Sequence, residues 1–296
     1  IAETAFNERA TAAYIAQELA ALGLEVFTGI GGTGVVGTLR RGSNDRTIGL
    51  RADMDGLPLT ERSGAPYAPA QPGAMHACGH DGHMTMVLGA LGQLAADDSW
   101  SGTAHAVFQP AEEPGKGAQA MIDDGLFTRF PMEAIHGIHN MPGWPAGHLL
   151  TRSGALMASE DNFVIRIIGR GGHASRPQLV IDPITIAAEV ITALQTIVAR
   201  SIDPAASGVV SCTEIHTDGS RNAIPSEVII KGDTRSFDPV VQATIESRMR
   251  LLVEGICAAH GATGHVEYTY EFEPTYNHPD ATALAIAAAQ QVVGAE

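Results

Sequence analysis

Hydrophobic positions in the first half of the chain recur at two spacings. Between residues 7 and 22, Tyr14, Ile15, Leu19 and Leu22 form one stripe at helical spacing, and Gly23 ends the segment. A second helical pattern covers residues 81–96. Short apolar or alternating runs predict strands at residues 25–28, 35–40, 46–52, 103–109 and 134–139. Because strands and helices alternate, we expect an α/β domain whose mostly parallel sheet is covered by helices.

A different order of elements begins near residue 160. Predicted strands at 162–168, 208–215, 227–231 and 265–272 are interrupted by two helices, which begin at Asp182-Pro183 and Asp238-Pro239. This β-α-β-β-α-β order is that of the ferredoxin-like, or split βαβ, unit. We expect a first domain starting with residues 1–159, an inserted βαββαβ domain at 160–273, and a return to the first domain at 274–296. The return contains only one Ala-rich helix, at 280–293, so we expect the chain to be truncated.

Charge and cysteine content narrow the expected partners and setting. The 296 residues carry a formal net charge of −15, which disfavours nucleic acid because its phosphates would be repelled. No apolar run is long enough to span a bilayer, so we expect no membrane partner. Three cysteines cannot form a disulfide framework, and we expect a reducing, cytoplasmic setting.

Potential metal-binding side chains are concentrated in residues 75–83, Met-His-Ala-Cys-Gly-His-Asp-Gly-His, which contain three histidines, a cysteine and an aspartate. Thiolate, imidazole and carboxylate groups bind zinc and transition metals. The glycines near His80 allow a tight turn, so that Cys78 and His80 can point at one centre. The alternative is a histidine-rich surface turn before the helix at 81–96. Two metal-type ligands two residues apart favour the metal site.

Further polar residues follow the predicted strands. Asp53 and Asp55 follow the strand at 46–52, where an open α/β sheet places its site, although a solvated turn explains them better when they are taken alone. Glu112 and Glu113 follow the strand at 103–109; since neighbouring side chains diverge, one can bind metal while the other handles protons. His139 ends the strand at 134–139. Three such elements predict one shared site.

These segments resemble the M20 metallopeptidase superfamily, and within it the amidohydrolase branch of hippurate hydrolases, N-acyl-amino-acid aminoacylases and auxin-conjugate hydrolases. The resemblance covers nearly the whole chain, and the cysteine-containing cluster is its most specific part. The matching stretches are Leu-Arg-Ala-Asp-Met-Asp-Gly-Leu-Pro (50–58), Met-His-Ala-Cys-Gly-His-Asp-Gly-His (75–83), Phe-Gln-Pro-Ala-Glu-Glu (108–113), Gly-Ile-His (137–139), Gly-Gly-His-Ala (171–174) and Asn-Ala-Ile-Pro (222–225).

The resemblance implies a role for each matching residue. The ligands of a centre of two divalent metal ions (Mn, Zn, Co or Ni) would be Cys78, His80, Glu113 and His139. Glu112 would be the general base and Asp55 a supporting catalytic carboxylate. His173 and Asn222, in a lid domain at 160–273 that also makes a homodimer, would bind the substrate carboxylate or the developing oxyanion.

Two departures from the family pattern stand out. Gln178 follows Pro177 where the family usually has a histidine, which puts that histidine's contribution in doubt. The family's last metal-binding histidine belongs to a C-terminal stretch that this chain does not contain.

The expected function is metal-dependent hydrolysis of the amide bond of N-acyl amino acids, by a linear-amide hydrolase of the aminoacylase or carboxypeptidase type. Two alternatives remain. Cys78 could be the nucleophile of an amidase, with a histidine as base. The chain could also be a non-catalytic protein that binds metal or ligand on the same fold, which the intact Glu112 disfavours. His76 and His83 lie within the cluster and stay secondary candidates as ligands.

Overall fold

The structure is a computed structural model that describes residues 1–68 and 73–294. The chain divides into two compact units, Ile1–Ala146 and Gly147–Glu296. In the first unit the helices are α1 (Arg9–Ala21), α2 (His80–Ala96), α3 (Gly117–Asp123) and α4 (Leu126–Arg129). Its strands are β1 (Glu25–Ile30), β2 (Gly34–Arg41), β3 (Thr47–Asp53), β4 (Gly102–Gln109) and β5 (Ala134–Gly137).

The first-unit sheet is mixed, which corrects the expectation of a mostly parallel sheet. Its strand order is β1-β2-β4-β3-β5; β3 is parallel to β4 and β5, whereas β2 is antiparallel to β1 and β4. The physical reason lies in the connection between β1 and β2. Only residues 31–33 join these strands, and so short a turn permits only antiparallel pairing.

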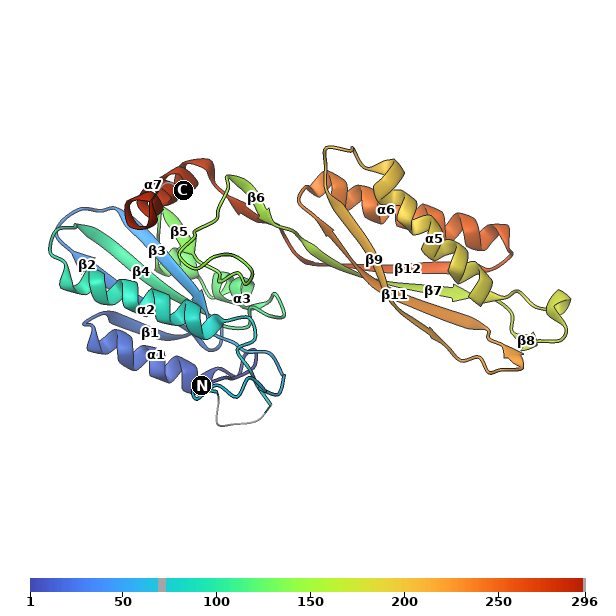
Figure 1. The fold of residues 1–296 in the computed structure, drawn as a ribbon, viewed down its shortest axis with the longest axis horizontal. Helices are drawn as coiled ribbons and strands as arrows, with labels where there is room; N and C mark the ends of the chain where they lie inside the picture. The colour runs from blue at the N-terminus through green and yellow to red at the C-terminus, as the bar shows by residue number, and fades with distance from the viewer. Residues whose placement is uncertain (69–72, 295–296) are drawn as a thin grey trace. The chain divides into compact units, whose positions relative to one another are not determined.

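Helices cover both faces of this sheet, as expected, and Figure 1 shows α1 and α2 side by side on one of them. Ile15 and Leu19 of α1 and Leu91 of α2 are fully buried against that face. On the opposite face, Met121 of α3 and Leu126 of α4 pack against Val107. Strands β2 and β4 contribute to the hydrophobic cores on both faces of the sheet, because successive side chains of a strand point to opposite faces.

The parallel strands fix where the candidate site lies. In the register of β3 and β4, Asp53 is opposite Gln109, and Arg51 of β3 is opposite Gly137 of β5. The carboxyl ends of these three strands therefore meet at one edge of the sheet. The segments that leave this edge carry Asp55, Glu112–Glu113 and His139, the residues that sequence analysis selected.

The second unit contains the predicted β-α-β-β-α-β order. The six elements are β7 (Glu160–Ile168), α5 (Pro183–Ser201), β9 (Gly208–Thr217), β11 (Glu227–Ser236), α6 (Pro239–Ala259) and β12 (Thr263–Phe272). The strands form an antiparallel sheet of order β12-β7-β11-β9, and α5 and α6 cover one face of it (Figure 1). Asp182 and Asp238 cap the two helices, accepting hydrogen bonds from the Ile184 N–H at 2.9 Å and the Val240 N–H at 2.7 Å. Both predicted helix starts are confirmed.

Several short elements complete the second unit. They are β6 (Gly154–Met157), β8 (Gly172–His173), the 3₁₀ helix η1 (Pro177–Leu179), β10 (Ala223–Ile224), β13 (Thr275–Asn277) and α7 (Pro279–Val293). Strands β6 and β13 pair, as do β8 and β10. The expected helix at 280–293 is therefore present as α7. Its return to the first domain stays a prediction.

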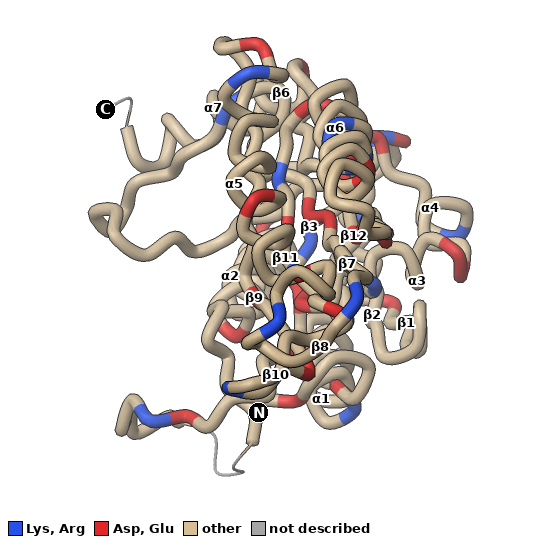
Figure 2. The backbone as a smooth tube through the Cα atoms, turned by 90° about the vertical axis from the view of Figure 1, so that its right-hand side faces the viewer, with Lys and Arg blue, Asp and Glu red and all other residues tan. Residues whose placement is uncertain are grey.

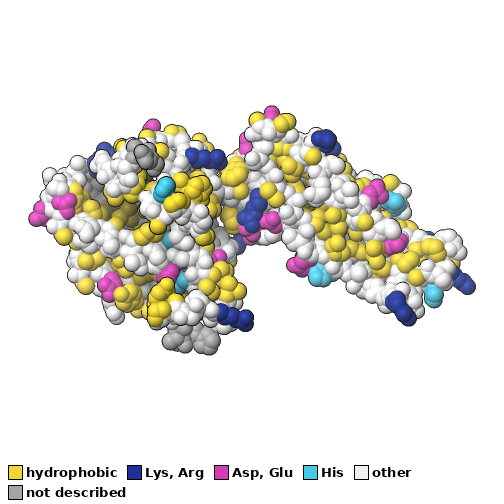
Figure 3. All heavy atoms as spheres, in the orientation of Figure 1, with side chains coloured by type: hydrophobic (Ala, Val, Ile, Leu, Met, Phe, Trp, Pro, Cys, Tyr) yellow, Lys and Arg dark blue, Asp and Glu magenta, His cyan; other side chains and the backbone are white. Residues whose placement is uncertain are grey.

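The helices α5 and α6 differ in the character of their outer surfaces. In contrast to the expectation that no apolar run is long enough to span a bilayer, α5 could cross a membrane by length and composition, the one such helix within the described residues. Val190, Leu194 and Ile197 nevertheless place its apolar face in the core. Its Ile184 is exposed, and Figure 3 shows hydrophobic side chains on the surface of the molecule. Acidic and basic positions both occur along α6 in Figure 2. Arg250 and Glu246 of this helix form an ion pair at 2.7 Å.

Candidate metal centre

The candidate site in the first unit is built around His80, the first residue of α2, whose side chain is fully buried. Its Nε2 lies 3.6 Å from Glu112 Oε2 and 3.8 Å from Glu113 Oε1. It also lies 3.7 Å from Oδ2 of Asp53. One imidazole nitrogen therefore faces carboxylates from two of the strand ends.

The start of α2 depends on Gly79, which precedes His80 in the left-handed conformation with φ +82°. A Cβ atom at this position would lie 2.3 Å from Oδ1 of Asn140. The left-handed backbone turn favours glycine here, and a larger residue would also have to displace the Asn140 side chain. This turn lets Cys78 and His80, two residues apart, point to the same centre, as the spacing predicted.

Cys78 and His139 meet on another side of the centre, with 3.4 Å between Cys78 Sγ and His139 Nε2. The Nδ1 of His139 lies 2.7 Å from the backbone oxygen of Asn140, so it carries the proton and donates it to that oxygen. Nε2 is then the nitrogen with a free lone pair. A histidine with one nitrogen anchored in this way is oriented for metal binding through the other.

Asp55 supports both His80 and the two glutamates. Its carboxylate is fully buried and accepts the backbone N–H of Glu112 at 3.0 Å and of Glu113 at 3.1 Å. Its Oδ1 lies 3.4 Å from Nδ1 of His80. Burial acts to raise the pKa of Asp55, but the contacts with His80 and the two N–H groups outweigh it and lower the pKa. The lowered pKa favours the ionised form of the Asp55 carboxylate.

Sequence analysis missed the roles of Asp53 and His83. His83 Nδ1 lies 2.6 Å from Asp53 Oδ1, and its Nε2 accepts the Asn140 backbone N–H at 3.0 Å. Arg51 holds the other Asp53 oxygen at 2.7 Å. Both His83 nitrogens are therefore engaged, and His83 ties β3 and α2 to the segment that carries His139. Its spacing of three residues from His80, one helical turn, was the available signal.

The donor set fits divalent cations. Buried atoms without a hydrogen-bond partner among the described residues include both ring nitrogens of His80 and Oε1 of Glu113. Two ligands of one tetrahedral ion, each at about 2.0–2.3 Å, lie roughly 3.3–3.7 Å apart. The 3.4 Å between Cys78 and His139 and the 3.8 Å between His80 and Glu113 are close to that separation.

The charges of the site agree with this fit. Burial, followed by the charges of Glu113, Glu112, Asp53 and Asp55, raises the pKa of the Cys78 thiol to about 11. Burial raises the pKa of Glu113 as well. The carboxylates near the Cys78 thiol would be compensated by the positive charge of a divalent metal ion held by Cys78, His80, Glu113 and His139.

Comparison with known proteins gives the family. The model of "Peptidase family M20/M25/M40" matches residues 49–296. The chain belongs to this family.

Individual members are similar over nearly the whole chain. A hippurate hydrolase of Campylobacter jejuni is 41% identical over 99% of this chain and 76% of its own length. An N-acyl-L-amino acid amidohydrolase of Geobacillus stearothermophilus is 37% identical over 94% of this chain and 75% of its own. A Bacillus subtilis structure described as a dinuclear metal binding peptidase from family M20 superposes with a TM-score of 0.84, at 31% identity over 98% of this chain and 76% of that one. The predicted M20 resemblance is confirmed, and the chain is an amide-hydrolysing enzyme.

In this M20 chain the last two selected residues, His173 and Asn222, lie in the second unit. They are neighbours there, because β8 pairs with β10 and the Ala174 N–H donates to the Asn222 backbone oxygen at 3.0 Å. Nδ1 of His173 accepts hydrogen bonds from the Ser175 N–H at 3.2 Å and hydroxyl at 2.9 Å. Contact with a ligand would therefore use Nε2 of His173.

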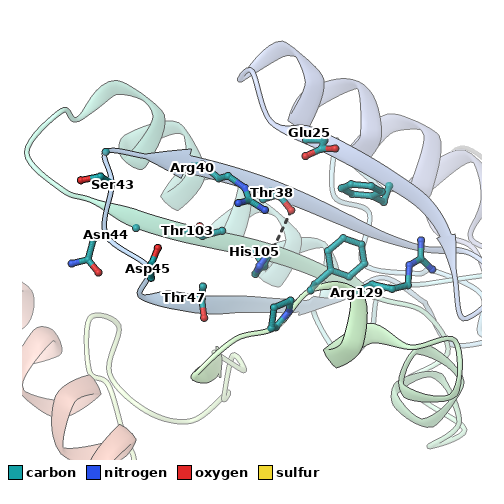
Figure 4. A pocket seen from close by; sticks show the side chains of 15 residues that line it. Glu25, Thr38, Arg40, Ser43, Asn44, Asp45, Thr47, Thr103, His105 and Arg129 are labelled. Carbon is teal, nitrogen blue, oxygen red and sulfur yellow. Dashed lines mark hydrogen bonds between the residues drawn. The ribbon is translucent and has the colours of Figure 1, made fainter.

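A separate pocket of about 290 Å³ lies on the α3–α4 face of the first-unit sheet (Figure 4). Its lining includes Thr38, Arg40 and His105 and none of the selected site residues. Burial lowers the pKa of His105, whose Nδ1 lies 3.0 Å from the Thr38 hydroxyl. His105 is thus a neutral residue of the sheet and not part of the metal centre.

Proposed function

We propose that this M20 enzyme hydrolyses the amide bond of N-acyl amino acids, using a water molecule activated at a two-metal centre. The observation that carries the proposal is a pair of candidate ligand groups that share His80: Cys78, His80 and His139 form one, and His80, Glu112 and Glu113 form the other. The names of the hippurate hydrolase and the N-acyl-L-amino acid amidohydrolase support this substrate class, since hippurate is an N-acyl amino acid.

In the proposed mechanism, different side chains of the site bind metal, transfer the proton and position the two glutamates. Divalent ions held by Cys78, His80, Glu113 and His139 would polarise the scissile carbonyl and acidify a water molecule. Glu112, whose side chain is 36% exposed against 21% for Glu113, takes the proton of that water. Glu112 then donates this proton to the leaving amine nitrogen. Asp55 keeps both glutamates in place through their backbone N–H groups.

The alternative in which Cys78 is a nucleophile has one observation in its favour, the 3.4 Å contact with His139. Two observations oppose it. A nucleophilic cysteine needs a lowered pKa, whereas the pKa of Cys78 is raised to about 11. The paired glutamates also have no role in that chemistry.

A substrate panel tests the proposal. We expect the chain, supplied with Mn²⁺, Zn²⁺, Co²⁺ or Ni²⁺, to release amino acids from N-benzoyl and N-acetyl amino acids, and chelation to stop the release. Turnover that survives complete metal removal and disappears in Cys78→Ser would favour the nucleophile. Tight metal binding without turnover on any substrate would favour the non-catalytic alternative.

We also propose that His173 and Asn222 bind the substrate carboxylate or the developing oxyanion. We expect His173→Ala to keep its metal content and lower kcat, because Nε2 is lost without any change to the ligands. His216→Ala is the matched control: His216 is exposed, also lies in the second unit, and pairs with Glu214. Light scattering should give the expected homodimer for both variants. Equal kinetics in both would make His173 a structural residue.

A further inference from the structure

Glu8, the residue before α1, is a buried carboxylate outside the metal centre, with an exposed fraction of 0%. Its Oε1 accepts the Phe6 N–H at 3.0 Å and the Ala111 N–H at 2.8 Å. Its Oε2 accepts the Thr33 hydroxyl at 2.5 Å. A carboxylate is costly to bury, so its retention in this place requires a compensating role.

Ala111 is the unusual partner of Glu8. It is fully buried and has φ +45°, a left-handed conformation that alanine rarely adopts because its Cβ atom crowds the backbone. Its two peptide groups are held from both sides. The N–H binds Glu8, and the carbonyl oxygen accepts the Gly117 N–H at 2.9 Å. Such a strained residue persists only where its surroundings determine it.

The strained residue immediately precedes Glu112. Three successive backbone N–H groups are then held by two buried carboxylates, that of Ala111 by Glu8 and those of Glu112 and Glu113 by Asp55. The direction in which the chain leaves Ala111 decides where both glutamate side chains point. We propose that Glu8 is a positioning residue, which holds Ala111 in the left-handed conformation and thereby aims Glu112 and Glu113 at the metal centre. This inference rests on the roles proposed above for the two glutamates.

The contact with Thr33 extends the same arrangement. Thr33 closes the three-residue turn between β1 and β2, and the Gly31 N–H of that turn donates to Asp124 Oδ2 at 3.0 Å. Oε2 of Glu8 is thus fixed by Thr33 of the turn, and Oε1 holds the Ala111 N–H, just before Glu112 and Glu113. Loss of the Thr33 hydroxyl should loosen Glu8 without removing it.

The decisive comparison uses two substitutions of Glu8 and one of Ala111. Glu8→Gln keeps an oxygen for the Phe6 and Ala111 N–H groups, and its amide can donate to the Thr33 hydroxyl, so we expect nearly normal kcat. Glu8→Met fills a similar volume but accepts no hydrogen bond, and we expect kcat to fall roughly 10²-fold, with weaker metal binding through Glu113. Adding Ala111→Gly to Glu8→Met should restore much of the loss, because glycine adopts positive φ without strain.

Hydrogen exchange at residues 111–113 adds a readout that does not depend on turnover. We expect faster exchange of these amides in Glu8→Met and normal exchange in Glu8→Gln. Should Glu8→Met fail to fold, Thr33→Val takes its place, with a smaller loss that Ala111→Gly again relieves.

Three results would overturn the inference: a Glu8→Met enzyme that melts earlier yet keeps its kcat and metal affinity, a Glu8→Gln enzyme as impaired as Glu8→Met, or no rescue by Ala111→Gly. An inactive parent chain with normal exchange responses would instead contradict the proposed function.

Discussion

Replacement of Glu112 by glutamine is expected to leave metal binding intact and to lower turnover by roughly 10²–10⁴-fold, the usual effect of removing a general acid–base group. Glutamine has nearly the same shape as glutamate but cannot accept the proton of the attacking water. The backbone bond from the Glu112 N–H to Asp55 is unaffected by the substitution, so the loop should keep its position. Metal content by elemental analysis and kcat on an N-acyl amino acid check the two halves of this expectation.

The neighbouring Glu113→Gln is the matched control, and we expect it to lose metal first and activity as a consequence. The comparison is informative because the two carboxylates lie at similar distances from His80 Nε2, 3.6 and 3.8 Å. Only the greater exposure of Glu112 and the family pattern separate their proposed roles. Metal loss in Glu112→Gln together with metal retention in Glu113→Gln would reverse the assignment.

The fold was predictable wherever its signal is local. The Asp-Pro pairs at 182–183 and 238–239 predicted the starts of α5 and α6, since capping and a fixed proline φ act within one turn. The direction of strand pairing is a different matter. Alternation identified β1 and β2 as strands but says nothing about their partners, and the antiparallel pairing follows from the short turn at 31–33.

The residues of the candidate site also differ in whether a local sequence signal predicts them. Spacing selected Cys78 and His80, and places at strand ends selected Glu112, Glu113 and His139; in the structure these residues form two clusters that share His80. Glu8 and the pairing of Asp53 with His83 were missed. Glu8 contacts Ala111 from 103 residues away, and Asp53 contacts His83 from 30 residues away. Supporting residues of this kind have no recognisable sequence motif, because an isolated acidic residue beside a helix is usually exposed.

Metal removal should change the reactivity of one cysteine out of three. With metal bound, Cys78 is expected to be shielded as a ligand, and chelation should expose it to iodoacetamide. Labelling is best followed at alkaline pH, because burial and the nearby carboxylates raise the pKa of the free Cys78 thiol to about 11 and leave little thiolate at neutral pH. Mass spectrometry of the labelled peptides measures the extent at each cysteine.

Cys212 and Cys257 are internal controls for this experiment. Both belong to the second-unit core, where burial raises their pKa, and neither is in a candidate metal-ligand cluster of the described residues. We expect chelation to raise the labelling rate of Cys78 by roughly tenfold or more, added Mn²⁺ or Zn²⁺ to reverse this, and the two control cysteines to respond to neither treatment. In His80→Asn, Cys78 should label at the chelated rate even with metal present, because a ligand of the same centre is missing. Equal labelling of Cys78 with and without metal in the unsubstituted chain would remove Cys78 from the ligand set.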